Sequence, residues 1–116
     1  MIKKKYCDKR KINVRLPQSV EEKFAQEAID LKGFIDTNDI NKAIQKKLFQ
    51  VLVADSATKE IIIKKTETEE PFKIKQIHID FETFKGIKNA SYKNDLPDIQ
   101  VTLSVLTNNY TIKGEN

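Results

Sequence analysis

The sequence predicts an α+β fold, with an N-terminal strand–helix–helix unit followed by a small β-rich C-terminal region. Three observations predict it. Apolar and polar residues alternate over 11–16, apolar residues recur at helical spacing over 20–31 and 40–54, and alternation returns in stretches of 61–112. Glycines and prolines lie where these periods change. We therefore divide the chain into a flexible basic arm (1–8), a strand–helix–helix domain (9–55) and a β-rich domain (56–116) for assembly, effector binding or partner binding.

The first predicted strand covers residues 9–16 and ends at Pro17. Its apolar side chains occupy alternate positions and share one face; they are Ile12, Val14 and Leu16. The intervening polar and basic side chains therefore lie on the opposite face. Because a single strand cannot satisfy its own backbone hydrogen bonds, its partner is either one of the later β segments or a second copy of the chain.

Two helices follow this strand. The first has a candidate N-cap in Ser19 and a stop signal in Gly33. The second can be capped by Asp36 or Thr37 and runs to about Ala54. Both helices have an apolar stripe that needs a partner, and the stripes include Phe24 in the first helix and Ile40, Ile44 and Leu48 in the second.

The second half of the chain alternates over shorter stretches. We expect strands over 61–63, 72–81 (with a bulge near Gln76), 99–105 and 110–112, and a short helix from Phe81 to about Lys88. A turn at residues 108–109 would lead into the last strand. We find no internal repeat in the residue pattern.

The net charge of +4 is unevenly distributed along the chain. Residues 1–16 carry seven Lys or Arg side chains and one Asp, a net charge of +6, whereas residues 17–116 carry 14 basic and 16 acidic side chains, a net charge of −2. This asymmetry indicates a polyanionic partner, with nucleic acid preferred over an anionic membrane surface. The apolar runs 51–54 and 61–63 are far shorter than the roughly 20 residues of a membrane helix.

Residues 11–54 resemble the ribbon-helix-helix family, which includes the Arc and methionine repressors. The resemblance rests on four stretches: Ile12-Asn13-Val14-Arg15-Leu16-Pro17, Val20-Glu21-Glu22-Lys23-Phe24, Leu31-Lys32-Gly33-Phe34 and Ile40-Asn41-Lys42-Ala43-Ile44. It implies an intertwined homodimer, or a higher oligomer, in which the strands of two chains pair and enter the DNA major groove. The dimer core would contain Ile12, Val14, Leu16, Phe24, Ile40, Ile44 and Leu48.

The polar face of the first strand carries the residues that we expect to contact DNA bases: Lys11, Asn13 and Arg15. Lysine and arginine suit the acceptors of guanine, and asparagine can make paired hydrogen bonds to adenine. The remaining basic residues of the arm and strand would contact the DNA backbone; they are Lys3, Lys4, Lys5, Lys9 and Arg10.

The start of the second helix is a further candidate for backbone contact. The resemblance implies that Thr37 and Asn38 meet a phosphate there. This stretch departs from the small neutral residues of the family, because Asp36 and Asp39 place two carboxylates beside that phosphate. Either Asp36 points away from the phosphate, or the contact is weak and the basic arm compensates for it.

We expect no enzymatic activity, no metal site and no cofactor. His78 is the single histidine, and although Asp80 and Glu82 share its strand face, three groups on one exposed strand lack a closed ligand shell. Cys7 is the single cysteine, which excludes a disulfide framework within the chain. Three scattered glycines cannot form a phosphate-binding loop.

The sequence therefore predicts a cytoplasmic, nucleoid-associated homodimer that binds double-stranded DNA and has no membrane partner. We expect a transcriptional repressor or autoregulator of bacterial, plasmid or phage origin. Plasmid partition, conjugation and antitoxin roles share the DNA-binding step. An alternative from another class is a phage- or plasmid-encoded inhibitor that dimerises through its first half and binds a host protein through residues 56–116.

Overall fold

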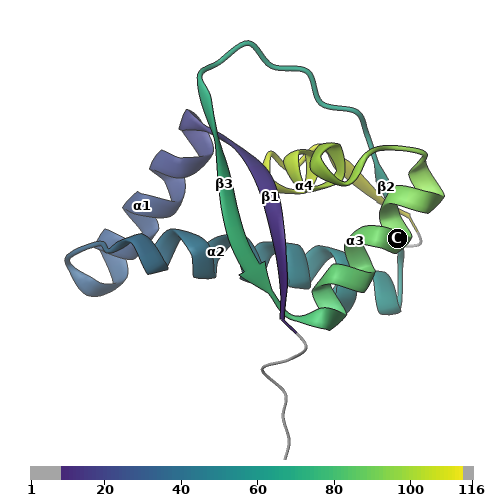
Figure 1. Ribbon diagram of the computed structural model, residues 1–116, viewed down its shortest axis with the longest axis horizontal. Coiled ribbons are helices and arrows are strands. Elements are labelled where there is room, and N and C mark those ends of the chain that lie inside the picture. Colours follow the sequence, from purple (N-terminus) through teal and green to yellow (C-terminus); the bar gives the residue numbers. More distant parts are fainter. Residues whose placement is uncertain (1–8, 114–116) are drawn as a thin grey trace, which may run out of the picture.

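Four α-helices and two antiparallel strand pairs make up the part of the chain that the computed structural model describes, residues 9–113 apart from the side chain of Thr37 (Figure 1). The fold is therefore α+β, as predicted, but the second half is not the β-rich region that we expected, because two of the four α-helices lie in it. The elements follow in the order β1 (Arg10–Pro17), α1 (Gln18–Lys32), α2 (Thr37–Phe49), the π-helix η2 (Gln50–Ala54), the 3-10 helix η3 (Asp55–Ala57), β2 (Glu60–Ile63), β3 (Phe72–Ile79), α3 (Phe81–Asn94), α4 (Asp98–Leu106) and β4 (Tyr110–Lys113).

β1 pairs antiparallel with β3 of the same chain, and we call this pair the β1–β3 ribbon. The register runs without interruption from Arg10 opposite Ile79 to Pro17 opposite Phe72. The bulge expected near Gln76 is therefore absent from this ladder. The partner of the first strand is a later β segment, which was the first of the two alternatives left open by the sequence. The second strand pair joins β2 to β4.

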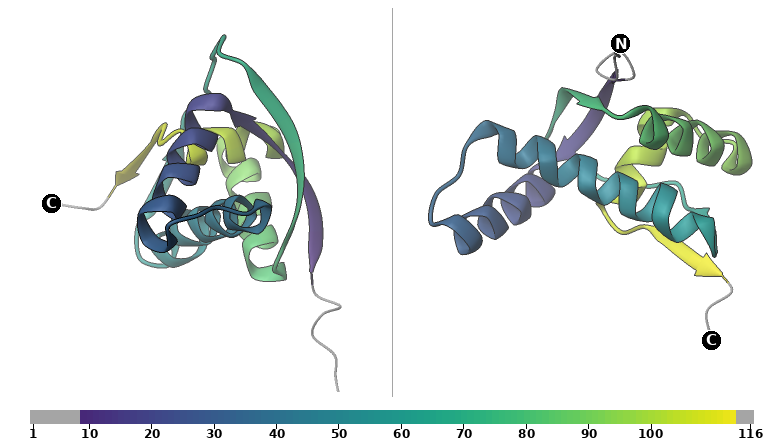
Figure 2. Two further views of the ribbon diagram at one scale, coloured as in Figure 1. Left: turned by 90° about the vertical axis from the view of Figure 1, so that its left-hand side faces the viewer. Right: turned by 90° about the horizontal axis from the view of Figure 1, so that it is seen from below.

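The helices lie on one side of the β1–β3 ribbon, and its other side is open (Figure 2). The inward side chains at the centre of β1 and at the end of β3 are apolar, and Val14, Leu16 and Ile79 are fully buried against the helices. Arg10, Lys73 and Lys75 share this register and lie at its margins. Antiparallel strands can keep one face in water when the other face covers the core. The fold thus exposes one ribbon face along its whole length.

The residues expected to form a dimer core are buried within one chain instead. Val14, Leu16, Phe24, Ile40, Ile44 and Leu48 are buried, and Ile12 is half-buried against the same cluster. β3 and the helices of the second half supply the apolar surface that we assigned to a second copy. Burial of these stripes therefore gives no reason to require a dimer.

The prediction of a strand over residues 99–105 is wrong, because this segment is the helix α4. Six consecutive residues, Val101–Leu106, are buried, so the helix has no polar face that would show helical spacing. Thr102 and Ser104 alternate with Val101, Leu103 and Val105, which gives the apolar–polar period of a strand. Their hydroxyls are satisfied inside the protein, since Thr102 Oγ1 donates to the carbonyl of Ile99 (3.0 Å) and Ser104 Oγ donates to the carbonyl of Lys64 (2.5 Å).

The ends of the first two helices follow local sequence signals with one exception. Gly33 ends α1 in the left-handed conformation (φ 86°), and Asp36 caps α2, as predicted. Ser19 is not the N-cap of α1, because the helix already begins at Gln18 after Pro17. The amide and hydroxyl of Ser19 donate instead to the carboxylate of Glu70, both at 3.0 Å.

The order strand–helix–helix occurs twice along the chain, as β1–α1–α2 and as β3–α3–α4. Each first helix starts directly after its strand, with Pro17 or Asp80 as N-cap, and ends at a left-handed residue, Gly33 (φ 86°) or Asp95 (φ 56°). The shared order concerns the elements alone, and the residue patterns of the two units differ, since α2 is amphipathic whereas α4 is largely buried.

Candidate nucleic-acid interface

The exposed side of the β1–β3 ribbon brings together the three residues that we expected to contact bases. Directly opposite residues of an antiparallel pair project to the same face. Because Val14 and Leu16 point inward, the alternate residues of β1 and the residues opposite them point outward. We call these side chains the ribbon face; they are Lys11, Asn13 and Arg15 from β1, and Phe72, Ile74, Gln76 and His78 from β3.

The seven residues of the ribbon face include basic, amide and apolar side chains and no carboxylate; the nearest described carboxylate on its β1 edge is that of Asp98, which lines a pocket with Lys11 and Asn13. Lys11 is opposite His78 at one end, and Asn13 is opposite Gln76 at the centre. An electropositive strand pair with hydrogen-bonding side chains has the chemistry needed for an electronegative groove. A major groove is wide enough to admit a two-stranded β-ribbon.

Arg15 is held in place by an aromatic ring on the same face. Its guanidinium carbon lies 4.0 Å from the centroid of the Phe72 ring. Within residues 9–113, no hydrogen bond or ion pair is made by its side chain, and its Nε is buried without a partner. The stacking contact restricts the side chain while its remaining donors stay available for a ligand.

The two amides at the centre of the ribbon face lie beside one another. Gln76 Nε2 is 3.5 Å from Asn13 Oδ1, at the outer limit of a hydrogen bond. This contact is weak, so a ligand with better acceptors and donors can replace it. Asn13 Nδ2 and Gln76 Oε1 provide a further donor and a further acceptor.

Two apolar side chains of β3 are exposed on the same face. Phe72 is 47% exposed and Ile74 is 54% exposed. Ile74 lies directly opposite Arg15, so an apolar and a cationic group occupy the same end of the ribbon. An apolar side chain at this place can contact the methyl group of thymine.

The residues expected to contact the DNA backbone are only partly placed by the structure. Lys9 is exposed just before β1. Arg10 belongs to the inward register of β1, and its guanidinium lies 4.6 Å from the ring centroid of Phe81. The predicted contacts of Lys3, Lys4 and Lys5 lie outside the described residues.

The start of α2 is already occupied by its own capping groups. Asp36 accepts hydrogen bonds from the amides of Asn38 (2.9 Å) and Asp39 (3.2 Å), and Asp39 accepts one from the amide of Asp36 (2.9 Å). A phosphate would have to displace these carboxylates to reach the same amides. The capping box therefore opposes the phosphate contact that we expected from Thr37 and Asn38.

A lysine neutralises one of these carboxylates. Lys32 Nζ lies 2.8 Å from Asp39 Oδ1. The hydrogen bond from Lys32, followed by the hydrogen bond from the Asp36 amide, holds the pKa of Asp39 below its usual value. The same contact raises the pKa of Lys32. These charges stabilise the α1–α2 turn and are remote from the ribbon face in sequence.

A cluster of cations and aromatic rings lies where β1 begins and α3 follows β3; we call this the α3 end of the ribbon. Arg10 lies over Phe81 (4.6 Å) and Phe84 (5.8 Å). Lys85 lies 5.2 Å from the Phe81 ring centroid, and Lys88 lies 5.3 Å from that of Phe84. Asp98 forms an ion pair with Lys88. Three cations are thus gathered around two rings at this end, together with the carboxylates of Asp98, of the N-cap Asp80 and of Glu82 in the first turn of α3.

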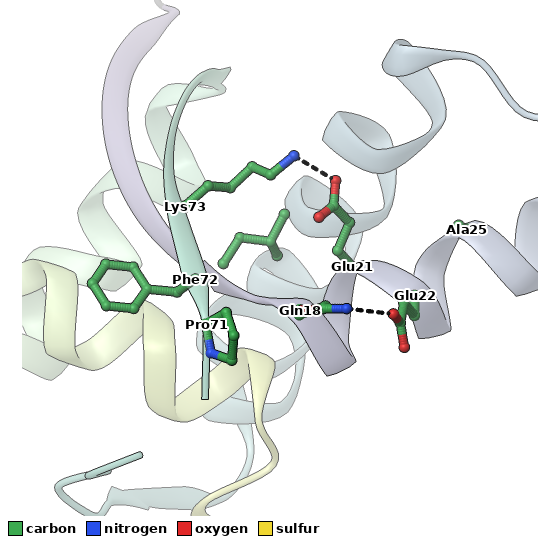
Figure 3. Close-up of a pocket in the computed structure, with 8 residues that line it drawn as sticks. Gln18, Glu21, Glu22, Ala25, Pro71, Phe72 and Lys73 are labelled. Carbon is green, nitrogen blue, oxygen red and sulfur yellow. Dashed lines mark hydrogen bonds and ion pairs between the residues drawn. The ribbon is translucent and has the colours of Figure 1, made fainter. Parts of the chain in front are cut away.

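The opposite end, where β1 leads into α1, is acidic; we call it the α1 end. Glu21 and Glu22 of α1 line an open groove of about 450 Å³ with Phe72 and Lys73 of β3. Figure 3 shows the amine of Lys73 directed at Glu21, 2.9 Å away, and the Phe72 ring on the other side of β3. The charge of Lys73 is therefore already compensated.

Sequence reasoning missed the four residues that β3 contributes to the ribbon face. We assumed that a second copy of the first strand would complete the ribbon, which left residues 72–79 without a role. Gln76 and His78 are the polar members of this set. The sequence does indicate that Gln76 and His78 lie on a polar strand face, since they alternate with the buried residues Ile77 and Ile79. Alternation does not reveal which other strand pairs with this one.

In the described part of the chain, no group of three or more His, Cys, Asp or Glu side chains is arranged to hold a metal ion. No helix within residues 9–113 combines the length and apolar character needed to cross a membrane.

Comparison with known proteins assigns the chain to no group. It matches no family model, no curated protein sequence and no solved structure.

Proposed function

We propose that the protein binds duplex DNA in a sequence-specific manner by placing the ribbon face in the major groove. The observation that carries this proposal is the exposed, carboxylate-free set of basic and amide side chains on a two-stranded ribbon covered by helices on its other side alone. Lys11 and Arg15 would donate to guanine, and Asn13 would pair with adenine. The biological role that follows is transcriptional repression or autoregulation, with plasmid partition and conjugation as roles that use the same DNA-binding step.

In this proposal, two units of one chain correspond to the two subunits of a ribbon-helix-helix dimer. The units β1–α1–α2 and β3–α3–α4 take the places of the two copies. The register supports this arrangement: Asn13 lies four residues before the N-cap Pro17, Gln76 lies four residues before the N-cap Asp80, and the two face each other. A two-fold axis relating the units would therefore pass between Asn13 and Gln76.

Homodimerisation is then a separate proposal with a different location. The edge of β1 that faces β3 is already paired, so a second copy would use another surface. The α1–α2 turn offers one, since Leu31 is 87% exposed and Phe34 is 59% exposed. The same apolar surface favours the second candidate function, a module that binds a protein partner rather than DNA.

Fluorescence anisotropy with labelled duplexes tests the proposal. We expect binding at low salt that weakens steeply as salt is added, because each neutralised phosphate releases counterions. The double variant Lys11→Ala/Arg15→Ala should lose most of this binding. Lys46→Ala, which removes an exposed lysine from α2, is the matched control and should bind more tightly than the double variant. Absence of wild-type binding at low salt would refute the proposal.

A further inference from the structure

On the basis of the proposed function, we infer that a single chain reads a non-palindromic DNA site, and that Gln76, Ile74 and His78 of β3 determine part of its sequence. Two features of the β1–β3 ribbon carry this inference. They are its pairing within one chain and the unlike residues at equivalent positions of its two strands.

The ribbon has the geometry of a two-fold pair but not its chemistry. Arg15 lies two residues before the N-cap of α1, and His78 lies two residues before the N-cap of α3, so these positions are equivalent. By the same count, Lys11 is equivalent to Ile74. Two identical strands would present identical side chains at both ends and would read a palindrome. Here each pair of equivalent positions differs.

The centre of the ribbon face favours A·T base pairs. Asn13 and Gln76 face each other, and both amides can bind adenine through its N6 and N7 atoms. One amide comes from each strand, so the two can reach adenines on opposite DNA strands. The weak contact between them, 3.5 Å from Gln76 Nε2 to Asn13 Oδ1, is replaced by base contacts on binding.

The two ends favour different base pairs. At the α1 end, the guanidinium of Arg15 can bind guanine while Ile74, directly opposite, contacts a thymine methyl group. At the α3 end, Lys11 supplies a compact positive charge and His78 supplies two ring nitrogens. Neither side chain has the several coplanar N–H donors of the Arg15 guanidinium. A base sequence that fits one end therefore does not fit the other.

Selection of bound sequences from random duplexes, with the chain-to-duplex ratio measured on the selected site, tests this inference. We expect one non-palindromic motif bound by one chain. Gln76→Ala should reduce discrimination at a central base pair by roughly 5- to 150-fold, as expected for one lost bidentate base contact. Gln26→Ala on α1, an exposed glutamine away from the ribbon face, is the matched control and should leave the motif unchanged.

The outcomes separate this inference from the proposed function. A palindromic motif bound by two chains, or an unchanged motif with Gln76→Ala, would overturn the inference and leave DNA binding standing. Failure to select any motif would overturn both. Because Gln76 is exposed, its alanine variant should fold, and a thermal melt checks this. The stoichiometry and symmetry of the wild-type complex need no variant.

Discussion

Replacement of Arg15 with alanine should reduce the preference for the cognate duplex by about 1–3 kcal/mol, which is the usual cost of one lost bidentate base contact. We expect the full size of this effect because the guanidinium of Arg15 is free to bind a base. Its carbon lies 4.0 Å from the Phe72 ring centroid, and within residues 9–113 it makes no ion pair that would compete with DNA. Its loss should cost the fold about 0.5–2 kcal/mol, the range from an exposed to a desolvated cation–aromatic contact, because Arg15 is half-buried.

Competition anisotropy, with a labelled cognate duplex and unlabelled cognate or random competitors, measures this preference. Arg15→Lys keeps the positive charge but loses the planar fork, so it should recover non-specific affinity and little discrimination. Phe72→Ala removes the ring that restrains Arg15 and should weaken cognate binding more than random binding. If Arg15→Ala weakens cognate and random duplexes by the same factor, Arg15 contacts the backbone and our assignment of base reading to the ribbon face is wrong.

Three further predictions concern stability and are measured by denaturant unfolding. Ile44→Ala should lower the free energy of unfolding by about 2–5 kcal/mol, because the side chain is fully buried; a loss below 1 kcal/mol would contradict the intrachain core. Gly86→Ala should cost about 1–3 kcal/mol, because a Cβ atom would lie 2.9 Å from the carbonyl oxygen of Leu52; unchanged stability would mean that α3 and η2 pack less closely. The hydrogen bond from Lys32 lowers the pKa of Asp39, so its stabilisation is present above pH about 4 and is lost as the pH falls further; Asp39→Asn should flatten this acid dependence, and an unaltered profile would refute the coupling.

The first half of the chain could be predicted because its elements are amphipathic and have local end signals. Gly33 and Asp36 act through the backbone within one or two residues, so their effect is visible in sequence. α4 could not be predicted in the same way, since burial on all sides removes the polar face that reveals a helix.

The partner of β1 could not be read from the sequence at all. Alternation shows which face of a strand is buried, but it does not show which other strand completes the ladder. Lys11, Asn13 and Arg15 were therefore placed on the correct face of their strand, while Gln76 and His78 were missed. The pairing is a property of the tertiary fold. It adds β3 to the candidate site, and the central residue of β3 in the site, Gln76, lies 63 residues after its partner Asn13.

The central claim is that both strands of one chain form the DNA-binding face. Amide chemical-shift mapping by NMR during titration with a selected duplex tests it most directly. We predict that the largest changes fall on β1 and β3 together, at Lys11, Asn13 and Arg15 and also at Gln76 and His78, and that they saturate at one chain per duplex. Changes confined to β1, or centred on Leu31 and Phe34 at the α1–α2 turn, would contradict it.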